Sequence, residues 1–206
     1  MIELYTWSTP NGRKVSIMLE ECGLPYHVRK INIGTNTEQF APEYLKINPN
    51  GKIPAIVDPD GPDGKPIAMM ESGAILVYLS GKTGKFLPKS VRGKYEALQW
   101  LMFQMGGVGP MFGQAHHFMR AKKDEVPYGS ERYGNEAKRL YGVMDRHLAG
   151  PRFFAKEYSI ADIAIYPWVA RHEWHRVDLG AFPNVRRWYD AVGARAAVVK
   201  GMAVPA

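Results

Sequence analysis

The first part of the chain changes from a strand-like to a helix-like pattern of apolar residues. Residues 1–7, MIELYTW, alternate between apolar and polar side chains, which is typical of a half-buried strand. Over residues 11–22 the apolar side chains recur three or four residues apart instead, which predicts an amphipathic helix. Its apolar positions are Val15, Met18, Leu19 and Cys22. The chain therefore begins with a strand, a tight turn and a helix.

Further strands and helices follow as far as residue 84. The turn-rich stretch PDGPDGKP separates two of the strands and favours a hairpin between them. The pattern predicts a strand in residues 23–32, a short broken helix in 37–52, strands at 53–58 and 67–70, and a helix at 71–84. The predicted order of elements is β-α-β-α-β-β-α.

Strand signals fade after this point and long helical patterns replace them. We predict helices at 93–105, 132–148, 159–175 and 183–198, joined by loops that contain glycine or proline. The stretch GGVGPMFG is placed between two helical segments. The fold class is therefore α/β plus all-α, with a first domain in residues 1–80, a linker in 81–87 and a helical bundle domain in 88–206.

The composition indicates where in the cell the protein is located. With 206 residues, 46% of them hydrophobic and 23% charged, the chain can bury a sizeable core. No apolar run is long enough to cross a membrane, and Glu3, Arg13 and Lys14 interrupt the place where a signal peptide needs its apolar segment. A single cysteine excludes an internal disulfide framework. We expect a cytoplasmic protein with no membrane partner.

The net charge of +7 is compatible with nucleic-acid binding, but the pattern of charges argues against it. Lysine and arginine are scattered along the chain, and no zinc-knuckle, RNP or basic-helix pattern is present. We expect an ordinary charged surface and no nucleic-acid partner, with a positive cleft for a small anion as the sharper alternative.

The predicted order of elements is that of a thioredoxin-like domain, which usually carries its reactive group where the first strand meets the first helix. Cys22 lies about ten residues further along the helix, or roughly 15 Å away, so it cannot act at that junction. Because Gly23 follows as a C-cap and Cys22 falls in the apolar stripe, we predict a buried structural thiol. Any reactive sulfur must then arrive with a ligand.

The junction WSTPNG offers groups that suit such a sulfur. Pro10 fits the first helical position, and Ser8 or Thr9 can be the N-cap. The N–H groups at a helix start favour a thiolate, to which Thr9 or Ser8 and the Asn11 amide can donate hydrogen bonds. The alternative, that these side chains only cap the helix, stays open.

Two further stretches can bind a peptide. A cis bond before Pro54 would turn the backbone of Ile53 outward to pair with an extended ligand, although the residues by themselves favour an ordinary trans proline. At a later helix start, Ser72 and free N–H groups can hold a carboxylate while Glu71 pairs with an ammonium. The alternative at that position is a simple cap.

Histidines occur in AHHF and HEWH but do not predict a metal site. His116 and His117 are adjacent and point apart on a helix, whereas His172 and His175 share a face without a clear third ligand. We expect no metal.

These motifs together resemble the soluble glutathione transferases over nearly the full chain, with a closer similarity to the bacterial Nu-class glutathione-dependent disulfide-bond reductases. The resemblance implies the cytosolic glutathione transferase fold, with an N-terminal thioredoxin-like domain. The stretches that carry it are TPNGRKV, NPNGKIPAIVD, ESGAILVYL, GGVGPMFGQAHHF, VPYGSERY and YSIADIAIYPW. The last contains Ser159 and Asp162, a capping box that starts a buried helix.

The resemblance also implies roles for particular residues, with glutathione as co-substrate. Thr9 and Asn11 would contact the glutathione sulfur, and Arg132 would reach the second glutathione of a bound glutathione disulfide. The residues implied to hold the tripeptide are Gln39, Lys52, Ile53, Glu71 and Ser72.

The activity implied is thiol–disulfide exchange on a small disulfide, with weaker conjugation of electrophiles or peroxidase activity, in a homodimer. A binding or regulatory module that keeps the fold without turnover is the alternative.

Overall fold

The computed structural model describes residues 1–122 and 125–205, which form two compact units. The first unit contains residues 1–85 together with the chain from Arg195 onward, and the second contains residues 86–194. The sequence placed all of residues 88–206 in the helical domain. The contacts instead assign the C-terminal segment to the first unit.

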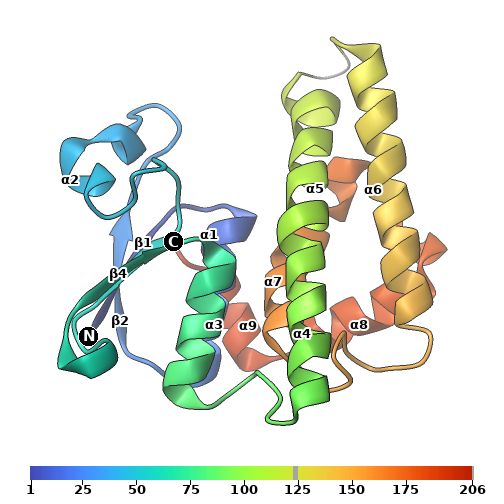
Figure 1. The fold of residues 1–206 in the computed structure, drawn as a ribbon. Helices are drawn as coiled ribbons and strands as arrows, with labels where there is room; N and C mark the ends of the chain where they lie inside the picture. Colours follow the sequence, from blue (N-terminus) through green and yellow to red (C-terminus); the bar gives the residue numbers. More distant parts are fainter. Residues whose placement is uncertain (123–124, 206) are drawn as a thin grey trace. The chain divides into compact units, whose positions relative to one another are not determined.

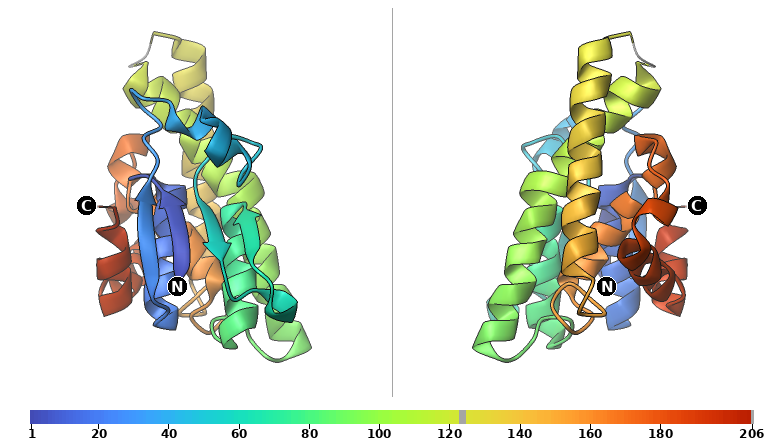
Figure 2. Two further views of the ribbon diagram at one scale, coloured as in Figure 1. Left: turned by 90° about the vertical axis from the view of Figure 1, so that its left-hand side faces the viewer. Right: turned by 90° about the vertical axis from the view of Figure 1, so that its right-hand side faces the viewer.

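A four-stranded sheet organises the first unit, in the order β2-β1-β3-β4 (Figure 2, left). Strand β1 runs parallel to β2, and β3 is antiparallel to both β1 and β4, so the predicted hairpin of β3 and β4 is present. Leu4 and Ile56 face each other across β1 and β3 with no exposed surface. The strands are β1 (Ile2–Thr6), β2 (Tyr26–Lys30), β3 (Ala55–Asp58) and β4 (Ile67–Met70).

Helix α1 packs against both α3 and α9 (Figure 1). Arg195 forms a two-pronged ion pair with Glu21, with N–O distances of 2.6 and 2.8 Å, and Ser16 Oγ donates a hydrogen bond of 2.7 Å to the Gly201 carbonyl. These contacts hold α9 to α1. The helices of this unit are α1 (Pro10–Cys22), α2 (Pro42–Leu45), α3 (Ser72–Thr83) and α9 (Ala196–Met202), with 3-10 turns at η1 (Glu38–Phe40) and η2 (Pro62–Gly64).

A nearly continuous helical column runs beside helix α6 in the second unit (Figure 1). The column is made of α4 (Val91–Phe103), the π-helical η3 (Gln104–Val108), α5 (Gly109–His116) and the π-helical η4 (His117–Ala121), and α6 spans Pro127–His147. GGVGPMFG is therefore helical, contrary to the sequence prediction. The proline lies in the first turn of α5, where proline is tolerated, and a Cβ at Gly109 would lie 2.8 Å from Gln104 Nε2, so glycine is favoured there.

The last two predicted helices are each divided. The segment 159–175 forms α7 (Ile160–Val169) and then the 3-10 turn η5 (His172–His175), while 183–198 is shared between α8 (Pro183–Gly193) and α9. A further 3-10 turn, η6, covers Leu179–Ala181. No helix in the described ranges is long and apolar enough to span a membrane.

Helix α7 is buried along its whole length, and its start is fixed by the predicted capping box. The Asp162 carboxylate accepts hydrogen bonds from the Ser159 N–H at 2.9 Å, the Phe154 N–H at 3.1 Å and the Trp188 Nε1–H at 2.8 Å. Burial raises the pKa of Asp162 to about 6 against the opposing effect of these donors. One carboxylate thus joins three segments of the helical core.

We expect Asp162→Ala to lower the free energy of unfolding by about 3–5 kcal/mol, because it leaves three buried N–H donors without their acceptor. Asp178→Ala is the matched control: it removes the cap of η6, an exposed carboxylate that accepts from the Gly180 N–H at 2.8 Å, and should cost less than about 1 kcal/mol. Urea unfolding curves measure both. Equal losses would contradict a central role for Asp162.

Candidate functional site

The register of the sheet brings the three predicted binding stretches to one edge. Tyr5 pairs with Ala55, and Ala55 pairs with Met70. Because β3 is antiparallel to both neighbours, the end of β1, the start of β3 and the end of β4 lie side by side. The turn into α1, the segment before Ala55 and the start of α3 all emerge from this edge.

Thr9 is the N-cap of α1, and Pro10 occupies the first helical position. Thr9 Oγ1 accepts a hydrogen bond from the Gly12 N–H at 3.1 Å, so its own proton can be donated elsewhere. A Cβ at Gly12 would lie 2.3 Å from Thr6 Oγ1 and 2.5 Å from the Trp7 carbonyl oxygen. Only glycine allows this close approach of the helix start to the end of β1.

Ser8 and Asn11, the polar residues beside Thr9, do not cap the helix. Ser8 is exposed and its Oγ accepts from Arg13 Nη2 at 3.1 Å, so Thr9 and not Ser8 caps the helix. Asn11 is the second residue of α1 and is half-buried. The sequence left open whether Ser8 or Thr9 is the N-cap, and the structure shows that it is Thr9.

Cys22 lies at the opposite end of α1, where Gly23 in the left-handed conformation (φ 71°) caps the helix. The thiol is buried, with its Sγ 3.4 Å from Thr83 Oγ1, and burial raises its pKa. A thiol with a raised pKa is a poor nucleophile. The prediction of a buried structural cysteine is confirmed.

The segment before β3 presents Lys52 and Ile53. The Ile53–Pro54 bond is cis, contrary to the trans bond that the residues alone favour. The Lys52 carbonyl accepts hydrogen bonds from Tyr44 Oη and from Asn48 Nδ2, the latter at 2.7 Å, while the Lys52 residue is exposed. Its backbone is therefore held from the protein side.

Gln39 lies in η1 and is 9% exposed. Its Oε1 is buried and has no hydrogen-bond partner among the described residues. Buried amide oxygens are normally paired, so this acceptor suits a donor that belongs to a ligand.

Glu71 is the N-cap residue of α3 and has φ 65° and ψ 109°, a conformation that costs a non-glycine residue about 1–3 kcal/mol. Its side chain makes no capping hydrogen bond and is exposed, and Ser72 is the first residue of the helix, 4% exposed. The alternative of a simple hydroxyl cap is therefore wrong. The Glu71 carboxylate therefore does not cap the helix.

Lys14 is a residue that the sequence reasoning missed. It is 1% exposed, and its Nζ donates a hydrogen bond of 3.2 Å to Ser72 Oγ, which links α1 to the start of α3. Burial lowers the pKa of this ammonium to about 7, with the charge of Glu71 acting in the opposite direction. A signal existed: Lys14 lies four and eight residues before Met18 and Cys22, on the buried face.

Arg132 lies apart from these residues in the chain and belongs to the second unit, on α6. It is exposed, and its guanidinium donates to Tyr128 Oη at 3.4 Å. Arg132 and Arg139 line a surface hollow of about 460 Å³, in which Arg139 is paired with Glu136 at 2.7 and 2.8 Å. The remaining lining residues are Met111, Tyr133 and Asn135.

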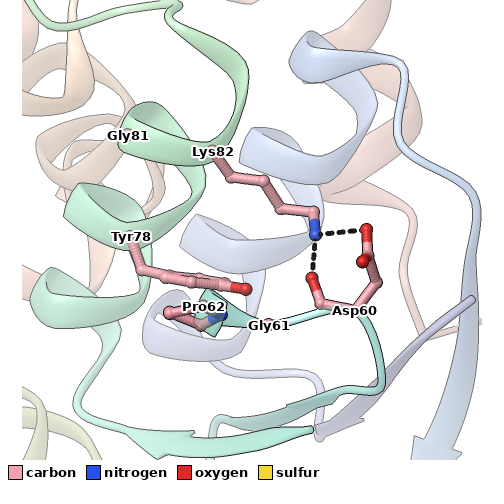
Figure 3. A pocket seen from close by; sticks show the side chains of 6 residues that line it. All are labelled: Asp60, Gly61, Pro62, Tyr78, Gly81 and Lys82. Atoms are coloured by element: carbon pink, nitrogen blue, oxygen red, sulfur yellow. Dashed lines mark hydrogen bonds and ion pairs between the residues drawn. The ribbon is translucent and has the colours of Figure 1, made fainter. Parts of the chain in front are cut away.

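Another hollow of about 460 Å³ lies between α3 and the connection from β3 to β4 (Figure 3). Lys82 Nζ contacts Asp60 and also lies 3.1 Å from the buried Asp58 carboxylate, to which Tyr78 donates at 2.6 Å. These hydrogen bonds, working against burial, lower the pKa of Asp58. The charges pair with one another, so we assign this network to the stability of the hairpin.

The histidines form part of an aromatic core in the second unit. His116 and His175 stack with ring centroids 4.4 Å apart, and burial lowers the pKa of His116 to about 4 and that of His175 to about 2. Among the residues that the structure describes, no group of three or more potential metal ligands is found.

The two units and the site at the sheet edge are those of a known protein family. The chain belongs to the glutathione S-transferase family: the family's N-terminal domain matches residues 9–82 and its C-terminal domain matches residues 127–191. Among similar proteins is the disulfide-bond oxidoreductase YfcG of Escherichia coli, 47% identical over 199 residues that cover 96% of this chain and 92% of the relative.

Solved structures give the same result. A glutathione transferase from Pseudomonas putida, with one glutathione disulfide bound per subunit, has a TM-score of 0.95 and 48% identity, covering 100% of this chain and 92% of that chain. One from Burkholderia graminis, with two glutathione molecules bound per subunit, has a TM-score of 0.93 and 48% identity, covering 99% and 88%.

The buried lysine leads to a prediction about stability. The unfolded chain keeps the Lys14 proton up to the ordinary pKa of 10.5, whereas the folded protein releases it at about 7. The unfolded state therefore binds more protons between these values, and stability rises with pH across that window. We expect Lys14→Met to be more stable than the wild type at pH 7 and below by on the order of 1–3 kcal/mol.

That advantage should shrink as the pH approaches 10. Denaturant unfolding at several pH values measures it, with Lys46→Met as the control because Lys46 is exposed in the same unit. A difference between wild type and Lys14→Met that does not change with pH would contradict a shifted pKa.

Proposed function

We propose that this protein is a glutathione-dependent disulfide-bond reductase that uses the thiolate of bound glutathione in place of a protein cysteine. The observation that carries the proposal is the difference between the two ends of α1. Its start presents Thr9 and Asn11 at the sheet edge, while the one cysteine is buried at its other end. Chemistry on sulfur at this edge requires a sulfur from the ligand.

Each part of glutathione has a counterpart at the edge. The Thr9 hydroxyl, the Asn11 amide and the N–H groups of α1 would stabilise the thiolate. The backbone of Ile53, with Lys52 and Gln39, would hold the cysteinyl and glycyl part, and Glu71 and Ser72 would hold the ammonium and carboxylate of the γ-glutamyl end. We therefore propose Thr9 and Asn11 as catalytic residues and the other five as binding residues.

The reaction proceeds by two exchanges. The bound thiolate attacks one sulfur of the substrate disulfide, a mixed disulfide with glutathione forms, and the other sulfur leaves as a thiolate that takes up a proton. A second glutathione thiolate attacks the glutathione sulfur of the mixed disulfide and releases the remaining substrate thiol. Two glutathiones are oxidised to glutathione disulfide by loss of two electrons, which reduce the substrate disulfide to two thiols.

Arg132 is proposed to bind a carboxylate of the second glutathione. A guanidinium recognises carboxylates well, and Arg132 lines a hollow with a second arginine. The glutathione disulfide and the pairs of glutathiones bound to the similar solved proteins support this assignment.

The remaining proposals are weaker conjugation of electrophiles or peroxidase activity with the same thiolate, assembly as a homodimer, and a cytoplasmic location. Sedimentation or light scattering tests the homodimer directly.

Removal of the Thr9 hydroxyl tests the mechanism. We expect Thr9→Ala to lower kcat/KM for glutathione-dependent reduction of bis(2-hydroxyethyl) disulfide about 10- to 100-fold, because a donor to the thiolate is lost. Cys22→Ala should stay within about 2-fold of the wild type. The assay follows formation of glutathione disulfide.

Removal of a helix cap away from the site tests whether the effect of Thr9→Ala comes only from lost stability. Ser90 Oγ accepts from the Gly93 N–H at 3.2 Å at the start of α4, so Ser90→Ala removes the same kind of cap as Thr9→Ala and should keep full activity. If Cys22→Ala abolished the reaction while Thr9→Ala and Asn11→Ala left it unchanged, the mechanism would be wrong.

The substitution Glu71→Gly should have opposite effects on the stability of the protein and on its binding of glutathione. Glycine relieves the positive φ, so we expect the free energy of unfolding to rise by about 1 kcal/mol while KM for glutathione rises about 10-fold through loss of the ammonium partner. Asp63, at φ 57° in the exposed turn between β3 and β4, gives the control Asp63→Gly, which should leave KM unchanged. A KM unchanged by Glu71→Gly would refute the γ-glutamyl assignment.

A further inference from the structure

Arg13 of α1 has a half-buried guanidinium without an acidic partner. Within the described residues the guanidinium makes one hydrogen bond, from Nη2 to Ser8 Oγ at 3.1 Å. Its Nε–H is buried and finds no acceptor in the part of the chain that the structure describes. Burial lowers the pKa of Arg13, and no charge of a described carboxylate opposes that effect. The positive charge of Arg13 is therefore not neutralised by an acid in the described ranges.

The guanidinium lies beside the start of α1. Residues four apart share one side of a helix and their side chains lean toward its N-terminus, so Arg13 leans toward Thr9. The hydrogen bond to Ser8, the residue before the N-cap, shows that the side chain reaches back over the first turn. Because four residues rise by about 6 Å, the charge lies within roughly 10 Å of the Thr9 hydroxyl.

Other charged side chains belong to α1 or to the elements that contact it. They are Lys14, Glu20 and Glu21 on α1, Glu3 on β1, Glu71 and Lys82 at the ends of α3, and Arg195 and Lys200 on α9. The two acids of α1 are in its last turn, and Glu3 and Lys82 are held in ion pairs. Burial lowers the pKa of Lys14 to about 7, with the charge of Glu71 acting in the opposite direction. Arg13 thus supplies a partly buried charge that stays positive across the neutral range.

Such a charge favours the ionisation of a thiol nearby. A positive charge stabilises a thiolate and not a thiol, so it lowers the pKa of the sulfur. At a distance of about 10 Å, with an effective dielectric constant between those of a protein surface and of water, the pKa changes by about 0.5 to 1. The effect of Arg13 adds to that of the N–H groups of α1, because both place positive charge at the same helix end.

We propose that Arg13 is an electrostatic residue of the candidate site, whose guanidinium increases the fraction of bound glutathione that is present as thiolate at neutral pH. This inference rests on the proposed function, because it assumes that the glutathione sulfur lies at Thr9. It gives a reason for a half-buried guanidinium with an unpaired Nε–H, which costs folding free energy in a residue that has only a structural role.

The first test titrates the thiol of glutathione bound to the protein, followed by the ultraviolet absorbance of the thiolate. We expect Arg13→Gln to raise the pKa of the bound thiol by about 0.5 to 1 relative to the wild type. Arg13→Lys keeps the charge and should stay close to the wild type. Arg29→Gln is the matched control, because Arg29 is an exposed arginine of the same unit that is paired with Glu3 at 2.6 Å, and its loss should leave the thiol pKa unchanged.

The second test uses the opposite effects of pKa on the amount and on the reactivity of a thiolate. A thiol of higher pKa ionises less but gives a more nucleophilic thiolate. At saturating glutathione, kcat/KM for bis(2-hydroxyethyl) disulfide should therefore be about 2- to 3-fold lower for Arg13→Gln than for the wild type at pH 5.5. At pH 9, where both thiols are ionised, it should be about 2- to 3-fold higher, after subtraction of the reaction in solution. General damage to the fold would lower the rate at both pH values.

Binding of S-methylglutathione separates the charge effect from the grip on the rest of the ligand. The methylated sulfur forms no thiolate, so the Kd of Arg13→Gln, followed by tryptophan fluorescence, should stay within about 2-fold of the wild type. Equal thiol pKa values in the wild type and Arg13→Gln, or an Arg13→Lys variant that behaves like Arg13→Gln, would overturn the role of the Arg13 charge. If the wild-type complex itself kept the thiol pKa of an ordinary cysteine, about 8.5, the proposed function would fail instead.

Discussion

The close approach of the start of α1 to the end of β1 is the constraint on which the site depends. Gly12 comes so near to Thr6 and Trp7 that no other residue fits, and this contact fixes the direction in which the first N–H groups of α1 point. Thr9 completes the junction by capping the helix through its acceptor side, which keeps its donor side available. The antiparallel pairing of β1, β3 and β4 then sets the distance from this junction to the other binding stretches.

Most of the fold could be predicted because local patterns and tertiary packing agree. The strands, the hairpin and the long helices follow from periodicity, and the capping box at Ser159 and Asp162 predicts the start of α7 correctly. The stretch GGVGPMFG was misread because glycine and proline usually interrupt helices. Here the proline falls in the first turn of α5, where it is tolerated, and Gly109 leaves space for the side chain of Gln104.

Other features could not be read from neighbouring residues. The cis bond before Pro54 has only a small intrinsic cost, so the surrounding structure decides it. The assignment of α9 to the first unit depends on the pair of Arg195 with Glu21 and on the contact of Ser16 with Gly201, which are separated by more than a hundred residues. The pattern marked Ser72 as a possible cap or ligand, but only the structure shows that it is inside the helix and contacts Lys14.

The proposed site divides the charges of glutathione between two helix starts. At α1 the bound sulfur must be a thiolate, which is favoured as the pH rises. At α3 the buried Lys14 ammonium donates a hydrogen bond to Ser72, and burial lowers the pKa of that ammonium to about 7. A lysine on the protein surface would stay charged near neutral pH, so burial is what makes the charge beside Ser72 sensitive to pH. Because the pKa of a thiol is lowered at a helix start, the charges at both helix starts would change close to neutral pH.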